Sequence, residues 1–237
     1  MKATGRCWSW GAVAGVLTAA VAALGAAGGG SAAGTRTSAP AGTTKAAAAP
    51  QELLNHVQDQ LRTVGTVEAD FVQVKTLAMF EHSVTISGHF AMQKPDRLMW
   101  IVKKPVRYAI RIEGSEIRQW DQDTNKVSVI QLGGDPVFKA VADQIQAWFM
   151  GDYKVLLETF DVQLQSRTPL VLGLLPKPDS VPAKMFKQID MAFGKDEKYI
   201  DTITLVESGG DVTKLTFIEP KLNEKIKSET WEIPPRE

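Results

Sequence analysis

The chain carries HSVTISGHFAM at residues 82–92 and, after the turn residues Lys94, Pro95 and Asp96, RLMWIV at residues 97–102. In the first stretch the residues of the two faces alternate: Val84, Ile86, Phe90 and Met92 fall on one face, and Thr85, Ser87, His89 and Ala91 on the other. A period of two is typical of a half-buried strand. The second stretch is apolar on both faces, and the short connection predicts a hairpin.

The same alternation continues on both sides of this hairpin. A strand is predicted at residues 67–75 before it, and three more at 106–113, 117–121 and 127–132 after it. Later strands are predicted at 160–165, 170–175, 186–193, 199–207 and 212–218, with a last extended piece at 229–233. Because the connections within each run are short, the strands pair as antiparallel neighbours.

Helical periodicity occurs in two places. Pro50 opens the first helix and Gly65 ends it. Its apolar stripe is Leu53, Leu54, Val57, Leu61 and Val64. The second helix starts at Asp135 and Pro136 and stops near Gly151, and a short piece follows through Leu157. The sequence therefore predicts a mainly β protein with an α lid, in which a single curled antiparallel sheet of about eleven strands is covered by helices.

The first 50 residues have a different composition. Residues 1–27 combine a basic start with a run of small apolar residues, which is typical of a secretory signal peptide cleaved near Ala27 or Ala33. An uncleaved membrane anchor is the alternative, although Ala and Gly make the run weakly hydrophobic. Residues 28–50 are predicted to be a flexible leader, and residues 51–237 one domain. Cys7 lies before the apolar run, which argues against a lipid-anchored protein.

The formal net charge of zero hides an uneven distribution. Residues 1–50 hold four basic side chains and no acidic one, so that 27 less 4 leaves 23 basic against 27 acidic residues in the rest of the chain. A mildly acidic domain lacks the basic surface that a nucleic-acid-binding protein needs.

Sequence patterns for catalysis and for metal or cofactor binding are missing. His56, His82 and His89 have no metal-ligand spacing and are predicted to be exposed. Residues 121–125 resemble the start of a calcium loop, but the residues that should complete it do not fit, so a hairpin turn is favoured. Glu68 and Asp70 share one face of a strand, and no His or Lys is evidently recruited to them. We therefore expect no catalytic residue, no metal and no cofactor.

Apolar residues are abundant on three consecutive strands and on the second helix. They are Phe90, Met92, Leu98, Trp100, Val102, Tyr108, Ile110 and Ile112 on the strands, and Val137, Val141, Ile145, Trp148 and Phe149 on the helix. They fit an ordinary core between sheet and helices. They also fit a cavity for acyl chains, because ligand pockets are mostly apolar and Met and aromatic side chains adapt to varied apolar guests.

Several short motifs resemble the LolA family of lipoprotein carriers. The stretch VEADFVQVK at residues 67–75 is similar to the family's A-x-F-x-Q strand. The stretch GHFAMQKPDRLMW at residues 88–100 is similar to its G-x-x-x-x-x-R-P-x-x-x-x-W hairpin. Smaller matches follow at Lys104-Pro105, Gly114, Trp120-Asp121 and Leu175-Pro176-Lys177. The resemblance covers about residues 51–234 and is most specific over 67–129.

This resemblance implies a LolA/LolB-like fold, an incomplete antiparallel barrel closed by helices, with an acyl-binding cavity. The implied cavity residues are Phe71, Phe90, Met92, Leu98, Trp100, Val102, Ile110, Val137, Val141, Ile145 and Phe149. Lys94 takes the place of a family Arg that helps to hold the lid over the cavity. Lysine lacks the planar bidentate geometry of arginine, so the latch is expected to differ here.

The resemblance also implies a function and partners. A member would be a monomeric periplasmic protein that catalyses no reaction and carries acylated lipoprotein, or a related lipid, from the inner to the outer membrane. Its partners would be an inner-membrane ABC-type release complex and an outer-membrane acceptor, and no nucleic acid. The alternative is a regulatory protein of the same fold that senses lipoproteins and acts on a membrane partner.

Overall fold

The structure, a computed structural model, describes residues 51–79, 82–131, 148–149 and 153–235. The first run of strands is β1 (Thr66–Thr76), β2 (Ser83–Gln93), β3 (Arg97–Lys104), β4 (Tyr108–Glu113), β5 (Glu116–Asp121) and β6 (Lys126–Gln131). The second run is β7 (Phe160–Arg167), β8 (Leu170–Pro176), β9 (Phe186–Phe193), β10 (Ile200–Glu207) and β11 (Val212–Leu222). The α-helices are α2 (Gln51–Arg62) and α4 (Tyr153–Thr159), and the short 3-10 helices are η3 (Pro182–Lys184) and η4 (Ser228–Trp231).

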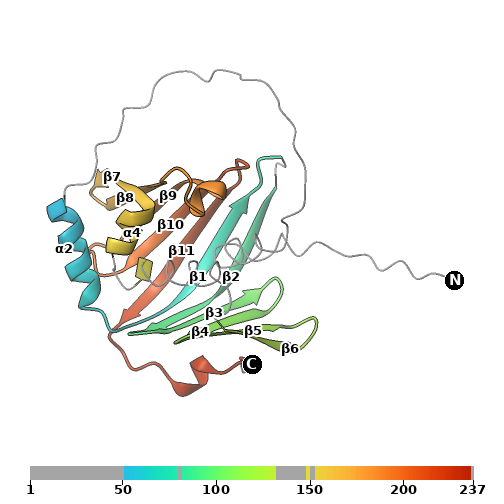
Figure 1. The fold of residues 1–237 in the computed structure, drawn as a ribbon. Coiled ribbons are helices and arrows are strands. Elements are labelled where there is room, and N and C mark those ends of the chain that lie inside the picture. The colour runs from blue at the N-terminus through green and yellow to red at the C-terminus, as the bar shows by residue number, and fades with distance from the viewer. Residues whose placement is uncertain (1–50, 80–81, 132–147, 150–152, 236–237) are drawn as a thin grey trace.

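All the strands belong to one 11-stranded sheet in the order β6-β5-β4-β3-β2-β1-β11-β10-β9-β8-β7 (Figure 1). Each run is an antiparallel meander, and the two meanders join where β1 pairs antiparallel with β11. The prediction of a single antiparallel sheet of about eleven strands is confirmed. The order starts at β6 and ends at β7, so the sheet is open and forms no closed barrel, as expected for an incomplete one.

One face of the sheet, here called the inner face, carries the main core. In β2 the buried residues Ile86, Phe90 and Met92 alternate with Ser87 and His89, which are more exposed. Inward residues from the strands form one continuous apolar cluster with residues of α2 and α4. The predicted alternation of β2 is therefore correct.

The helix α2 packs on this core through Leu54, Val57 and Leu61. Glu52 in its first turn and Arg62 in its last turn complement the helix dipole. The predicted second helix lies mostly outside the described residues, except for Trp148 and Phe149, which are helical. Figure 1 shows α2 and α4 beside the half of the sheet that β7–β11 form.

Gly88 on β2 lets an aromatic side chain lie flat on the inner face. A Cβ atom at this position would clash with the carbonyl oxygen of Ile101 and would lie 2.5 Å from Cζ of Phe71. The freed space is filled by the ring of Phe71, which stacks on Trp100 with centroids 4.0 Å apart. A glycine is therefore needed where the ring crosses the strand.

The opposite, outer face is covered by the C-terminal segment, residues 223–235, here called the C-terminal tail. Trp231 is 4% exposed and packs with Ala91, Met99, Ala109 and Trp120 in a second apolar cluster. Its ring lies 4.5 Å from the guanidinium carbon of Arg97. The apolar residues on both faces of β3 are explained, because the tail covers the outer ones. The extended piece predicted at 229–233 is wrong, since residues 228–231 form η4.

Smaller sequence predictions also have definite outcomes. Residues 121–125 connect β5 to β6 as a hairpin, in which Asp121 Oδ1 accepts the backbone N–H of Thr124 at 2.9 Å. The strand predicted from residue 106 begins at Tyr108, and the one predicted to end at 218 continues to Leu222. No helix in the described ranges has the length and hydropathy needed to cross a membrane. The predicted signal peptide and leader lie outside those ranges.

Candidate functional site

An aromatic group forms the centre of the inner face. The rings of Phe90 and Phe149 have centroids 4.8 Å apart, and Phe217 of β11 lies 5.2 Å from Phe90. Trp100 meets Phe90 edge-on at 5.9 Å. Tilted and edge-on arrangements of this kind stabilise aromatic clusters beyond the area that they bury. The group joins both halves of the sheet to the segment that contains Phe149.

An apolar recess opens beside this aromatic group. It encloses about 370 Å³, part of which is open to solvent. Its lining is Leu61, Val64, Val67, Phe90, Met92, Phe149, Lys198, Tyr199, Ile200, Phe217 and Pro220. The recess therefore lies between the end of α2, the β1–β2 pair, and the β9–β10 connection with β11. Its lining is mostly apolar, as is usual for a ligand pocket.

Lys94 lies at the end of α2, close to the recess. Its Nζ atom donates a hydrogen bond to the carbonyl oxygen of Leu61 at 2.8 Å. The last carbonyls of a helix have no partner within the helix, so a lysine there satisfies one of them and complements the dipole. Burial, assisted by the positive charge of Arg62, lowers the pKa of Lys94. The described contact of Lys94 is thus with α2.

Buried polar atoms without a partner also occur on the inner face. Gln73 is 1% exposed, yet its Nε2 atom has no hydrogen-bond partner among the described residues, and neither does Nε1 of buried Trp148. A buried donor that stays unsatisfied costs about 1–3 kcal/mol.

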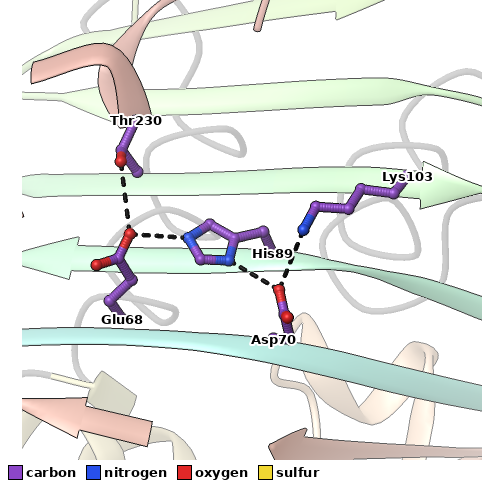
Figure 2. Close-up of polar contacts among 5 residues, drawn as sticks. All are labelled: Glu68, Asp70, His89, Lys103 and Thr230. Carbon is purple, nitrogen blue, oxygen red and sulfur yellow. Dashed lines mark hydrogen bonds and ion pairs between the residues drawn. The ribbon is translucent and has the colours of Figure 1, made fainter. Parts of the chain in front are cut away.

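A polar cluster lies on the outer face, where Figure 2 shows His89 between Glu68 and Asp70. His89 Nε2 is 3.0 Å from Glu68 Oε1, and His89 Nδ1 is 2.9 Å from Asp70 Oδ1. Both ring nitrogens can donate only when the imidazole is protonated, so this geometry fits the imidazolium. Thr230 Oγ1 donates to Glu68 Oε1 at 3.4 Å and attaches the tail to the cluster.

The charge of this outer polar cluster is balanced by a lysine. Lys103 Nζ donates to Asp70 Oδ1 at 3.2 Å. Burial alone would raise the pKa of Asp70, but hydrogen bonds and charges from His89 and Lys103 together hold that pKa below its usual value. The prediction that no His or Lys joins the two carboxylates is wrong, and so is the prediction that His89 is exposed, since its side chain is only 21% exposed. The cluster faces away from the recess and holds the tail on the sheet.

No metal site is formed by the residues that the structure describes, since none of their His, Cys, Asp and Glu side chains make a group of three or more suited to an ion. A sequence model described as outer membrane lipoprotein carrier protein LolA matches residues 62–234.

The chain belongs to the LolA family. An outer-membrane lipoprotein carrier protein of Legionella pneumophila (strain Paris) is 24% identical over 184 residues, which cover 76% of this chain and 84% of the relative. Among solved structures, a LolA superfamily protein from Nitrosomonas europaea superposes with a TM-score of 0.40 and 10% identity, covering 76% of this chain and 96% of that one. A putative outer membrane lipoprotein-sorting protein domain from Vibrio parahaemolyticus gives a TM-score of 0.44 and 11% identity, with coverages of 76% and 94%.

The cavity residues expected from the LolA resemblance fall into separate groups. Those on the strands are all buried in the inner-face cluster: Phe71, Phe90, Met92, Leu98, Trp100, Val102 and Ile110. Of the expected set, only Phe90, Met92 and Phe149 line the recess. Val137, Val141 and Ile145 lie outside the described residues, as does most of the segment that Lys94 was expected to latch. A latch between Lys94 and the lid of this LolA-family chain stays a prediction.

Other residues that line the recess of this LolA-family chain could not be recognised from the sequence pattern. Leu61 and Val64 had been assigned to the helical stripe, and Phe217 to a late strand, without any link to a cavity. They reach the recess only because β1 pairs with β11 and brings the ends of the domain together. Lys198 lies between β9 and β10, where no periodic pattern marks a residue as facing a pocket. Tyr199 is the first residue of the strand predicted at 199–207, again without any link to a cavity.

Proposed function

We propose that this LolA-family protein is a soluble periplasmic carrier that shields the acyl chains of lipoproteins, or of a related lipid, and catalyses no reaction. The observation that supports this most directly is the apolar recess on the inner face, which is open to solvent and lined by Phe90, Met92, Phe149 and Phe217. Recesses with a lining of this kind are the usual places where apolar ligands bind.

The energy of acyl burial is sufficient for a carrier. Each buried methylene contributes about 0.8 kcal/mol, so that even half of a twelve-carbon chain gives roughly 5 kcal/mol. The aromatic and Met side chains of the recess suit such a guest, since they adapt to chains of different shape. Burial of an acyl chain against these side chains would therefore repay its removal from water.

We further propose that the inner-face residues named above form the acyl site together with the segment at residues 132–152. In this proposal Phe71, Leu98, Trp100, Val102 and Ile110 form the floor and Phe90, Met92 and Phe149 the walls. The cargo would be received from an inner-membrane ABC-type release complex and delivered to an outer-membrane acceptor. Family membership and relatives named as outer-membrane lipoprotein carriers support this direction of transport.

The test is binding of acylated cargo by the purified protein. Native mass spectrometry should detect co-purified lipid, and a fluorescent peptide with an acylated N-terminus should bind while its unacylated form should not. Phe149→Glu should weaken binding more than about tenfold, because it places a charge in an apolar pocket. Phe149 is half-buried at the rim of the core, so this variant should still fold.

A matched control places the same charge on another apolar residue. Met79 is 88% exposed and lies outside the recess, so Met79→Glu should bind as the unaltered protein does. The proposed function is wrong if the unaltered protein neither holds lipid after purification nor takes up the acylated peptide. Equal effects of Phe149→Glu and Met79→Glu would place the acyl site elsewhere.

A further inference from the structure

Among the described residues, the lining of the recess contains one charged side chain, that of Lys198 in the connection between β9 and β10. Apart from Tyr199, the remaining lining residues are apolar. Lys198 is half-buried. A lysine in this setting keeps its methylene stem on apolar surface and its ammonium group toward water.

The ammonium group of Lys198 has no ion-pair partner in the described part of the chain. Glu197 is used by other groups, since Oε1 lies 2.7 Å from Arg167 Nη1 and Oε2 lies 3.1 Å from His56 Nε2. Asp196 Oδ1 accepts the backbone N–H of Lys198 at 3.3 Å and makes no ion pair with its side chain. A half-buried cation next to apolar surface is thus left without a counter-ion.

The other cations near the recess have different roles or positions. The Nζ atom of Lys94 is held by the carbonyl oxygen of Leu61. Arg62, the residue after Leu61, is exposed and adds positive charge at the same end of α2. Lys198 is therefore the cation of the described lining that is free to contact a ligand. Two carboxylates lie near it, since burial and, after burial, the charges of Asp201 and Asp196 raise the pKa of the neighbouring Tyr199.

We propose that the recess takes an anionic amphiphile, with an acyl chain against Phe90, Phe149 and Phe217 and an acidic headgroup on the ammonium of Lys198. This inference rests on the proposed function, because it specifies the chemistry of the ligand that the recess carries. The ligand is a lipid rather than free phosphate, since the apolar lining offers nothing to an inorganic ion. Charge-assisted hydrogen bonds to an ammonium are among the stronger ones in proteins.

The test compares twelve-carbon ligands that differ in headgroup charge. Calorimetric titrations of the delipidated full chain use dodecyl phosphate, neutral lauroyl glycerol and inorganic phosphate, with both amphiphiles below their critical micelle concentrations. Lys198→Gln should weaken dodecyl phosphate binding about tenfold and change lauroyl glycerol binding less than about twofold. Lys198→Arg should keep most of the affinity for dodecyl phosphate.

The control is Lys195→Gln, which makes the same charge change at an exposed residue of the same connection, outside the lining. It should leave both amphiphiles unchanged, and inorganic phosphate should not bind. The inference is overturned if Lys198→Gln affects both amphiphiles equally or neither, or if Lys195→Gln matches it. Failure of the unaltered protein to bind either amphiphile would instead contradict the proposed function.

Discussion

The role of a single side chain depends on which residues the neighbouring strand or helix places beside it. Asp70 lies directly opposite His89 in the β1–β2 register, and Glu68 is the diagonal neighbour on the same face. The alternation of β1 is enough to predict that the two carboxylates share one face. That His89 lies between them follows only from the register of β2 against β1. The contact of Lys94 with Leu61 also could not be read from the sequence, because it depends on how the β2–β3 turn meets the end of α2.

The outer polar cluster predicts a pH dependence of stability. The pKa of Asp70 is lowered in the folded protein, so its contacts stabilise the fold above the ordinary carboxyl pKa of about 3.9 and are lost as the pH falls through the folded-state value. Asp70→Asn should lower the free energy of unfolding at neutral pH by up to about 1 kcal/mol, because the side chain is exposed. Urea unfolding at several pH values measures this difference, which should shrink as the pH falls toward about 3.

The matched control for that series is Asp123→Asn in the β5–β6 turn. Asp123 is exposed, and no ion pair is found for it among the described residues. Its substitution should leave stability within about 0.5 kcal/mol at every pH. A loss for Asp70→Asn that stays the same from neutral to acidic pH would contradict the role of its charge.

At the level of elements, the close approach of β1, β2 and β3 depends on Gly88. Gly88→Ala should destabilise the protein by about 2–3 kcal/mol, because the methyl group would meet the ring of Phe71 and the backbone of Ile101. Denaturant unfolding measures the change, and near-ultraviolet circular dichroism reports the disturbed Phe71–Trp100 stack. Gly209→Ala is the control, since a Cβ there has no atom within 4 Å. Equal stability of the two variants would contradict the packing described here.

Helices and strands with a clear hydrophobic period could be predicted from the sequence. Which element packs over which surface could not. The strand at residues 186–193 has the predicted bounds, because alternation is strong there. Residues 229–233 are predicted from sequence to be extended, whereas residues 228–231 form η4, and Trp231 packs on Met99 and Trp120. A short segment takes its conformation from the surface that it covers, and that surface exists only once the sheet has formed. For the same reason Phe90 and Met92 could be placed on the correct face, but Lys198 could not be placed at the recess.

At the scale of the whole molecule, the two faces of one open sheet have separate tasks. The outer face is closed by the C-terminal tail through apolar packing, the polar cluster and a hydrogen bond from Arg111 to the carbonyl oxygen of Trp231 at 2.8 Å. The inner face keeps an apolar recess open between α2, the central strands and the β9–β10 connection. The recess on the inner face is the place proposed for cargo, and the tail packed on the outer face stabilises the sheet.

The most direct measurement of acyl binding at the inner face is photo-crosslinking with mass-spectrometric mapping. An acylated peptide with a photoreactive group at the end of its acyl chain is bound to the full chain and irradiated. Crosslinks are expected on recess residues such as Phe90, Phe149 and Phe217, and an excess of unlabelled acylated peptide should abolish them. Crosslinks confined to the outer face near Met99 and Trp231, or crosslinks that the unlabelled peptide does not reduce, would contradict acyl binding at the inner face.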